Sequence, residues 1–234
     1  MNETPIELPQ PSGRDHAHLA LKTALSALPL VGGPAAELFA AIIAPPLARR
    51  RDDWLEALAE GLSALKEKVA SVTPESLANN EAFVSVVMQA SRAALQTHQK
   101  EKLEALRNAV LNVAAGRAPD EDQQAMFMSY IETLTTWHIR MLKFFDAPMR
   151  MAAACGARTD YSIAGALAQP LEDVFPKLRG QRDFYDQIAR DLKARGFLNS
   201  ADDILHVMMS GSGMSAKRTT ETADRFLAFI TSPL

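Results

Sequence analysis

Residues that could carry catalysis are few in this sequence, and they stand apart from one another. The only cysteine, Cys155, lies in an alanine-rich stretch without a neighbouring histidine, which fits a buried small apolar residue better than a nucleophile. His16 and His18 are two residues apart, a weak metal-binding spacing, and His138 beside Trp137 fits the edge of a core. The metalloprotease, phosphate-loop and serine-hydrolase motifs are absent. We therefore expect a non-enzymatic protein without a cofactor or a metal site.

One glycine-rich segment, Ser210-Gly211-Ser212-Gly213, has the composition of a phosphate cradle. Backbone amides in such a loop can bind an anion when a helix follows and a lysine closes the loop. No clear helical pattern follows it directly, and no lysine stands in that register. We predict a mobile loop there.

The composition indicates which elements must position the remaining polar residues. The chain has 234 residues, of which 47% are hydrophobic, 23% charged and only 6% aromatic, and this balance favours helices over sheets in a globular protein. A single cysteine excludes an intrachain disulfide. The net charge is −3, so the chain lacks the overall positive field of most nucleic-acid-binding proteins. Residues 1–11 hold three prolines and no secretory signal, which predicts a disordered arm and a cytoplasmic protein.

The N-terminal part, residues 12–117, reads as an all-helical domain. We expect a first apolar helix with Asp15 as its N-cap, and a second helix that starts at Pro34. Pro45 and Pro46 predict a kink or a short break, because they remove two backbone donors. Beyond them, Arg49 opens an amphipathic helix.

Two further helix starts follow in residues 12–117. Thr73-Pro74-Glu75 predicts a short helix, and Asn79-Asn80 precedes a long helix expected to run from Glu81 to about Ala115. Gly116 fits the left-handed residue that ends it.

We place the boundary between the two domains at residue 118, so that residues 118–234 form a second, also mainly helical domain. Residues 119–122 repeat the start pattern, with proline first and acidic residues in the first turn. Periodic apolar residues predict a helix over 123–145, broken near Thr135-Thr136. Residues 163–175 and 184–195 predict two more helices, the latter closed by Gly196.

After Gly196, residues 197–198 and 205–209 read as short strands around a turn, and Thr220 caps a final helix. This succession resembles the winged helix-turn-helix of bacterial regulators over residues 136–231. The residues that match its two phrases are Leu192, Gly196, Phe197, Leu198, Thr220, Glu221, Phe226 and Leu227. Thr222 and Ala223 stand where that family has leucine and glycine. The resemblance implies a mainly α fold with a small β wing.

The same resemblance implies a DNA-binding surface on the helix at 184–195 and on the wing. The residues that would contact nucleic acid are Arg182, Tyr185, Gln187, Arg190, Lys193, Lys217 and Arg218. Residues 177–195 hold six basic and three acidic side chains, a local net charge of +3. However, Asp186 precedes Arg190 by four residues, and Asp191 precedes Arg195 by four, which is the spacing of internal ion pairs. We therefore favour an interaction or structural role for this module, with DNA binding as the alternative.

A second alternative is membrane association through the apolar stretch at residues 19–48. Between Lys22 and Arg49 its only charged residue is Glu37, but prolines and glycines divide it into arms too short to span a bilayer. The residues that would contact lipid are Leu38, Phe39, Ile42, Ile43, Arg49, Arg50 and Arg51. Buried in a core or between protomers, the same stretch favours a homo-oligomer. Our leading expectation is thus a non-enzymatic cytoplasmic interaction or regulatory protein.

Overall fold

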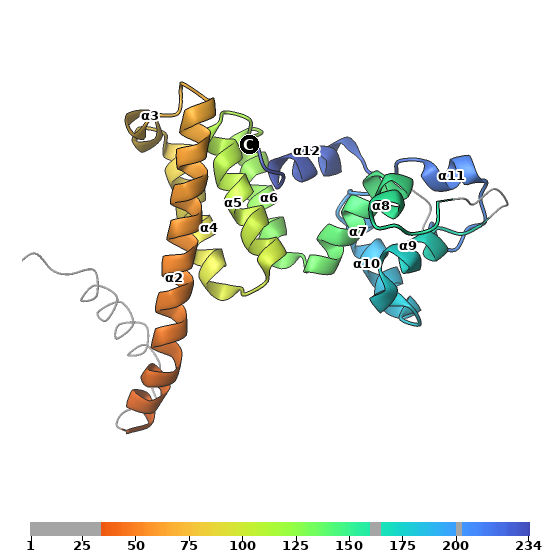
Figure 1. Cartoon of the computed structure of the whole chain (residues 1–234), viewed down its shortest axis with the longest axis horizontal. Helices are drawn as coiled ribbons and strands as arrows, with labels where there is room; N and C mark the ends of the chain where they lie inside the picture. Colours follow the sequence, from red (N-terminus) through yellow and green to blue (C-terminus); the bar gives the residue numbers. More distant parts are fainter. Residues whose placement is uncertain (1–33, 160–164, 200–202) are drawn as a thin grey trace, which may run out of the picture. The chain divides into compact units, whose positions relative to one another are not determined.

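The computed structural model describes residues 34–159, 165–199 and 203–234, and these residues are mainly helical (Figure 1). The expected first helix, capped by Asp15, and the arm at 1–11 lie outside them. The first helices are α2 (Pro34–Lys68), α3 (Pro74–Ala78), α4 (Glu81–Gln96), α5 (Lys100–Ala114) and α6 (Glu121–Thr133). Then follow α7 (Thr136–Asp146), α8 (Pro148–Ala154), α9 (Ala168–Val174), a 3-10 turn η1 (Pro176–Leu178), α10 (Arg182–Ala194), α11 (Gly211–Ser215) and α12 (Glu221–Phe229).

The chain divides into two compact units, residues 1–56 and 57–234. The predicted domain boundary at residue 118 stays a prediction. We expected a kink or a short break at Pro45-Pro46; in the first unit a break is wrong, because α2 continues through both prolines, while a kink there stays a prediction. The fixed φ of proline is compatible with a helix, but each proline removes an amide donor and its ring crowds the carbonyl four residues earlier, so the carbonyls of Ala41 and Ile42 lack their helical partners.

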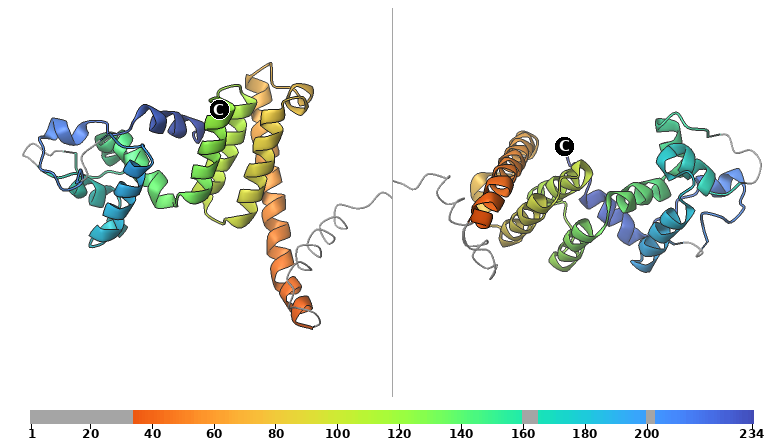
Figure 2. Two further views of the ribbon diagram at one scale, coloured as in Figure 1. Left: turned by 180° about the vertical axis from the view of Figure 1, so that it is seen from behind. Right: turned by 90° about the horizontal axis from the view of Figure 1, so that it is seen from below.

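The second unit begins with a helical layer in which α4, α5 and α6 pack side by side (Figure 2). The single helix expected over 81–115 is wrong: α4 ends at Gln96 and α5 begins at Lys100, and the cap residues between them, Thr97 and Gln99, are extended. The two helices then pack against each other as a hairpin. Both helices have small, buried residues, among them Ala90 and Ala109, which favour a close approach of the backbones.

The predicted caps at the start of this unit are confirmed. The Thr73 hydroxyl accepts a hydrogen bond from the Ser76 amide and caps α3, while the Asn80 side chain accepts one from the Phe83 amide and caps α4. At Gly61, an added Cβ would lie 3.0 Å from a methyl carbon of Leu111. Glycine thus allows α2 to lie close to Leu111, and a larger residue would require the leucine side chain to shift.

In a second group of helices, α10 packs against α7, while α8 packs against both α7 and α9. The break predicted near residue 135 is confirmed, since α6 ends at Thr133 and α7 begins at Thr136. Helix α12 contacts α5 as well as α7 and so joins the two groups (Figure 2). Its Phe226 stacks on Phe197 at 5.1 Å between ring centroids and meets Phe127 edge-on at 5.5 Å.

The predicted β wing is not seen in the described residues. Leu198 and Thr219 form one isolated antiparallel bridge, and Gly165 and Met209 form another, without a strand at either place.

The segment expected as the second strand of the wing is mostly a turn. The amides of His206 and Val207 both donate to the carbonyl of Asp203, and in this described segment only Met209, at its end, forms a bridge, with Gly165. The loop predicted at Ser210–Gly213 is wrong as well, because Ser210 caps the short helix α11 through the Gly213 amide.

Candidate functional site

The residues predicted to contact nucleic acid gather around α10 and the segment that leads into α12. Helix α10 is strongly amphipathic, and its inner face is formed by the buried side chains Tyr185, Ile188, Ala189 and Leu192. Gly196, at a φ of 75°, ends it in the left-handed conformation that glycine favours. The outer face therefore presents Gln187 and Arg190 to solvent.

Tyr185 lies on the inner face, where it cannot reach a nucleic acid. Its hydroxyl donates a hydrogen bond to Glu172 at 3.1 Å. Burial, together with the Glu172 carboxylate, raises the pKa of Tyr185 to about 12. The side chain is thus a neutral donor that fastens α10 to α9.

The charged groups of α10 have intramolecular partners, but not the ones predicted. Asp186 lies 3.5 Å from the Arg182 guanidinium and 2.8 Å from His206 Nε2, and it does not pair with Arg190. Arg190 instead donates to the Gln187 side-chain oxygen at 3.1 Å. Tertiary packing brings His206 to the carboxylate, which no helical spacing could predict.

Asp191 likewise turns away from Arg195. It accepts a hydrogen bond from Gln187 at 2.7 Å and lies 3.5 Å from the imidazole of His138 on α7. Arg195 lies over the ring of Tyr130, 5.4 Å from its centroid. The charged side chains on the outer face of α10 are therefore held in contacts within the protein and do not form a row of cations available to phosphate.

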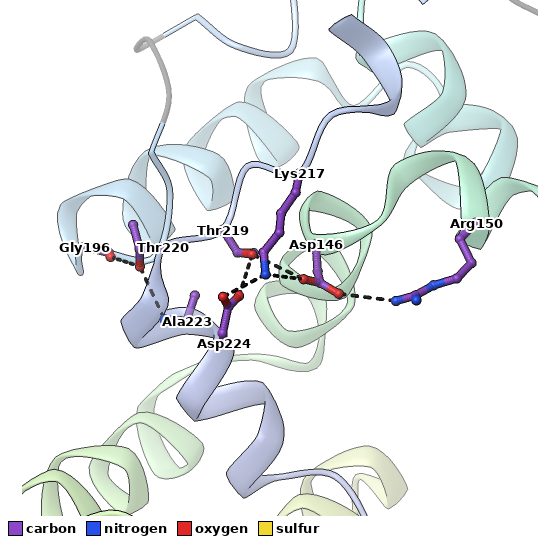
Figure 3. Close-up of polar contacts among 8 residues, drawn as sticks. All are labelled: Asp146, Arg150, Gly196, Lys217, Thr219, Thr220, Ala223 and Asp224. Atoms are coloured by element: carbon purple, nitrogen blue, oxygen red, sulfur yellow. Dashed lines mark hydrogen bonds and ion pairs between the residues drawn. The ribbon is translucent and has the colours of Figure 1, made fainter. Parts of the chain in front are cut away.

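Lys217 is held between two carboxylates at the start of α12 (Figure 3). Its ammonium lies 2.7 Å from Asp224 and 3.4 Å from Asp146, and the Thr219 hydroxyl donates to Asp224 at 2.8 Å. The hydrogen bond to Asp224 raises the pKa of Lys217. Burial raises the pKa of Asp224, but the Lys217 ammonium and the Thr219 hydroxyl outweigh it and lower that pKa overall. Asp146 also faces Arg150 at 3.4 Å, so this network contains its own counter-charges.

The two phrases that carry the family resemblance meet directly beside this network. The Thr220 hydroxyl donates to the Gly196 carbonyl at 2.6 Å and accepts from the Ala223 amide at 3.3 Å, which caps α12 (Figure 3). The Thr220 amide donates to the Phe197 carbonyl at 3.0 Å. The end of α10 is thereby tied to the start of α12.

Arg218 and Lys193 are the last two residues that we predicted to contact nucleic acid. The Arg218 guanidinium donates to the Gly213 carbonyl at 2.6 Å, and its backbone amide donates to the Phe145 carbonyl, so it fastens α11 to α7. Lys193 is half-buried.

The structure also has an aromatic surface beside α10, which we did not predict from the sequence. Phe184 is 42% exposed, and its ring meets Trp137 of α7 edge-on at 6.4 Å. Phe175 meets the same indole at 5.6 Å, while the Arg140 guanidinium lies 5.0 Å from the indole centroid. One feature of the sequence could have indicated this surface: these three aromatic residues lie on three different predicted helices, in a chain poor in aromatics.

The predicted lipid-contacting residues lie on α2. Leu38 is 64% and Ile42 is 58% exposed, whereas Ile43 is half-buried. The side chain of Phe39 lies outside the description. Arg49 and Arg50 are exposed, and Arg51 pairs with Asp52 at 2.9 Å. In the described part of the chain, no helix is both long and apolar enough to cross a membrane.

Cys155 is exposed, so the expectation that it is a buried apolar residue is wrong. It follows the last residue of the short helix α8, where the chain turns toward solvent. Within the residues that the structure describes, no three histidine, cysteine or acidic side chains gather as a metal site would require.

The comparisons with known proteins add no family to this geometry. No protein-family model matches the chain, and neither a curated protein nor a solved structure is significantly similar to it.

Proposed function

We propose that the protein is a non-enzymatic, cytoplasmic interaction protein whose residues 136–231 act as a winged-helix-like module that binds protein instead of DNA. The order of α7, α9, α10 and α12 supports the module. So does the bridge between Leu198 and Thr219, which stands where a wing would begin.

The observation that carries the proposal is the internal pairing of the basic residues. Binding to duplex DNA depends on Lys and Arg side chains that neutralise phosphates. Lys217 is bound to two carboxylates, and the Arg182 guanidinium faces Asp186. Each of these contacts would have to break before either residue could neutralise a phosphate, and the released carboxylates would repel it.

The aromatic surface formed by Trp137, Phe175 and Phe184 favours a protein partner, because large aromatic side chains are enriched at protein interfaces. Both signs of charge border it, since Lys177 and Asp183 are exposed. A two-fold contact between copies requires such a self-complementary patch. A second copy of the chain is therefore the partner that we propose for this surface.

Sedimentation velocity of the full chain over a micromolar concentration series tests this proposal. We expect the mass to rise with concentration and Phe184→Asp to hold the protein monomeric. Met208→Asp is the matched control, because Met208 is also an exposed apolar side chain, at 65%, and should leave the mass unchanged. A wild-type monomer at all concentrations, or equal effects of both variants, would contradict the proposed contact.

DNA binding is tested on the same samples by retardation of a duplex at low salt. We expect no shift for the wild type. A shift that weakens steeply with added salt and is strengthened by Asp186→Asn would refute our proposal in favour of DNA binding.

A further inference from the structure

The first turn of α7 is capped by a side chain that can take up a proton. The backbone amide of Thr135 donates a hydrogen bond to Nδ1 of His138 at 3.2 Å, and the Thr135 hydroxyl lies 2.8 Å from the same nitrogen. His138 stands at the third position of α7, so its ring supplies the side chain that reaches back to the cap residue in a capping box. The contact lies where the chain leaves α6 and enters α7.

The Thr135 amide determines which nitrogen of His138 carries the hydrogen. A backbone N–H can only donate, so Nδ1 must be unprotonated, and the hydrogen of the neutral ring lies on Nε2. Nε2 faces the Asp191 carboxylate of α10 at 3.5 Å. The imidazole therefore accepts a hydrogen bond at the start of α7 and faces an anion of α10 on its other side.

A second proton on the ring changes these two contacts in opposite directions. A protonated Nδ1 is a donor, so it can no longer accept from the Thr135 amide, whereas the Thr135 hydroxyl can reverse its role and accept. On the other side, the imidazolium is attracted to the Asp191 carboxylate. Protonation thus removes the amide contact that caps α7 and strengthens the contact with α10.

The surroundings of His138 oppose this second proton. The side chain is only 11% exposed, and burial lowers the pKa of His138. Among the described residues, α10 presents two charged groups to the ring: Asp191 favours the imidazolium, and Arg195 disfavours it. The neutral, capped form is therefore the one present at neutral pH.

The other elements that pack against α7 bring their charges elsewhere. Helix α8 and the start of α12 place theirs around Asp146, at the last residue of α7, and the described partners there are Arg150, Lys217 and Asp224. Further along α12, Glu221 pairs with Arg225. On α7 itself, Arg140 pairs with Glu101 of α5.

The first turn of α7 also carries the centre of the aromatic surface. Trp137 directly precedes His138, and its indole is the ring that both Phe175 and Phe184 meet edge-on. The first amides of a helix lack intrahelical partners, so the first turn depends on its cap. Loss of that cap loosens the turn, and the indole then loses its fixed place between the two phenylalanines.

From these contacts we propose that His138 is a proton-sensitive cap for the aromatic surface: the neutral imidazole holds the first turn of α7 and Trp137 in place, and the imidazolium releases them. The consequence for association between copies rests on the function proposed above. The effect on Trp137 does not, so the two can be tested separately.

A nuclear magnetic resonance titration of the isotope-labelled full chain from about pH 8 to about pH 5 tests the cap, since histidine changes its charge in this range and ordinary carboxylates do not. The chain has two tryptophans, so Trp137→Phe assigns both indole signals. We expect the Trp137 indole and the Thr135 amide to shift as His138 takes up its proton, with a midpoint below about pH 6.5. Trp54 is 4% exposed on α2, and its signal should stay in place.

His138→Gln is the decisive variant. Glutamine is a standard residue at this position of a capping box, because its side-chain oxygen accepts from the cap amide and takes up no proton. We expect its Trp137 signal to stay at one position throughout the titration. The matched control is His206→Gln, since His206 also lies beside an α10 carboxylate, 2.8 Å from Asp186. Its Trp137 signal should titrate as in the wild type.

Three results would overturn the inference. One is a Trp137 signal that stays in place while His138 takes up its proton. Another is a shift of that signal with the same midpoint in His138→Gln as in the wild type. The third is a neutral His138 ring whose hydrogen lies on Nδ1.

Sedimentation velocity on the same samples reports on the proposed function. If copies associate through the aromatic surface, the wild type should dissociate at about pH 5, and His138→Gln should not. A wild type that is monomeric at both ends of the titration would contradict the contact between copies, and the resonance titration would still decide on the cap. Copies that associate equally at both ends, although the Trp137 signal shifts, would overturn the link between the cap and the contact.

Discussion

Asn112 is the residue whose replacement should most clearly report on the attachment of α12. It is 4% exposed, and its side-chain amide lies within hydrogen-bond distance of the carbonyls of Ala228, Phe229 and Thr231, at 3.3, 3.0 and 2.8 Å. The neighbouring Asn108 donates to the Ile230 carbonyl at 3.0 Å. The last carbonyls of a helix lack intrahelical partners, and here α5 supplies the donors.

The size of the effect follows from these contacts. An amide NH₂ has two hydrogens, so Asn112→Ala removes at most two hydrogen bonds at any moment, and the Asn108 carbonyl, 3.0 Å away, is a fourth acceptor within reach. At about 1 kcal/mol for each lost hydrogen bond, with a further contribution from the small cavity, we expect a loss of roughly 2–4 kcal/mol. Asn112→Asp should cost at least about 1 kcal/mol more at neutral pH, because a buried carboxylate would then face carbonyl oxygens.

Urea unfolding followed by circular dichroism measures both variants. Asn79→Ala is the matched control: its side chain donates to the Glu75 carbonyl at 2.9 Å, but it is exposed, so we expect less than about 1 kcal/mol. At low pH the gap between Asn112→Asp and Asn112→Ala should narrow, since a protonated carboxyl can donate one hydrogen bond. Equal stabilities of the two Asn112 variants at neutral pH would refute the donor role.

Two pH-dependent predictions concern the polar networks. Burial lowers the pKa of His138 despite the opposing effect of Asp191, so the folded protein binds this proton less well than the unfolded chain does. The free energy of unfolding should therefore rise with pH up to about 6.5. In urea titrations His138→Gln should remove this dependence on pH, and an unchanged dependence would contradict the assignment. The pKa of Lys217 is raised, so its contribution to the free energy of unfolding, at most about 1 kcal/mol at this half-exposed site, is present below about pH 10.4 and lost as pH rises through the folded pKa. Lys217→Met should therefore be less stable than the wild type at pH 7, and the difference should shrink as pH rises through the folded pKa; an equal difference at neutral and alkaline pH would contradict this.

Local capping chemistry accounts for what could be predicted of the fold. Thr73, Asn80 and Thr220 each stand directly before a helix and accept a hydrogen bond from an amide in its first turn. Gly116 and Gly196 have positive φ at 66° and 75°, as residues that end helices do. These signals depend on neighbours in sequence, so they can be read without knowledge of the tertiary structure.

Breaks that depend on packing could not be predicted in this way. The segment between α4 and α5, residues 97–99, contains no glycine or proline, yet the chain reverses there. Small residues along both helices make their pairing favourable, and that pairing decides where the helix ends. At Pro45 the reverse happened: we predicted a break, but the exposed helix α2 continues through both prolines.

At the candidate site, too, contacts set by the tertiary fold could not be predicted from the sequence. The i,i+4 rule predicted that Asp186 and Asp191 would pair with Arg190 and Arg195, and these partners are wrong, although Asp186 does pair at the same spacing with Arg182, at 3.5 Å. Asp186 pairs with His206, twenty residues later in the chain, and Asp191 with His138, fifty-three residues earlier. Such partners are fixed by the tertiary fold, and no spacing along α10 encodes them.

The partners of these charges bear on function as well as on stability. A cation held by two fixed carboxylates, as Lys217 is, keeps its charge but loses its attraction for phosphate, because an approaching anion meets Asp146 and Asp224 at nearly the same distance. Phe184 has no such constraint, since burial against another protein gains apolar contact without breaking an ion pair. The same helix is therefore better suited to a protein partner than to a duplex, although the longer segment that contains it, residues 177–195, has a net charge of +3, which alone favours the duplex.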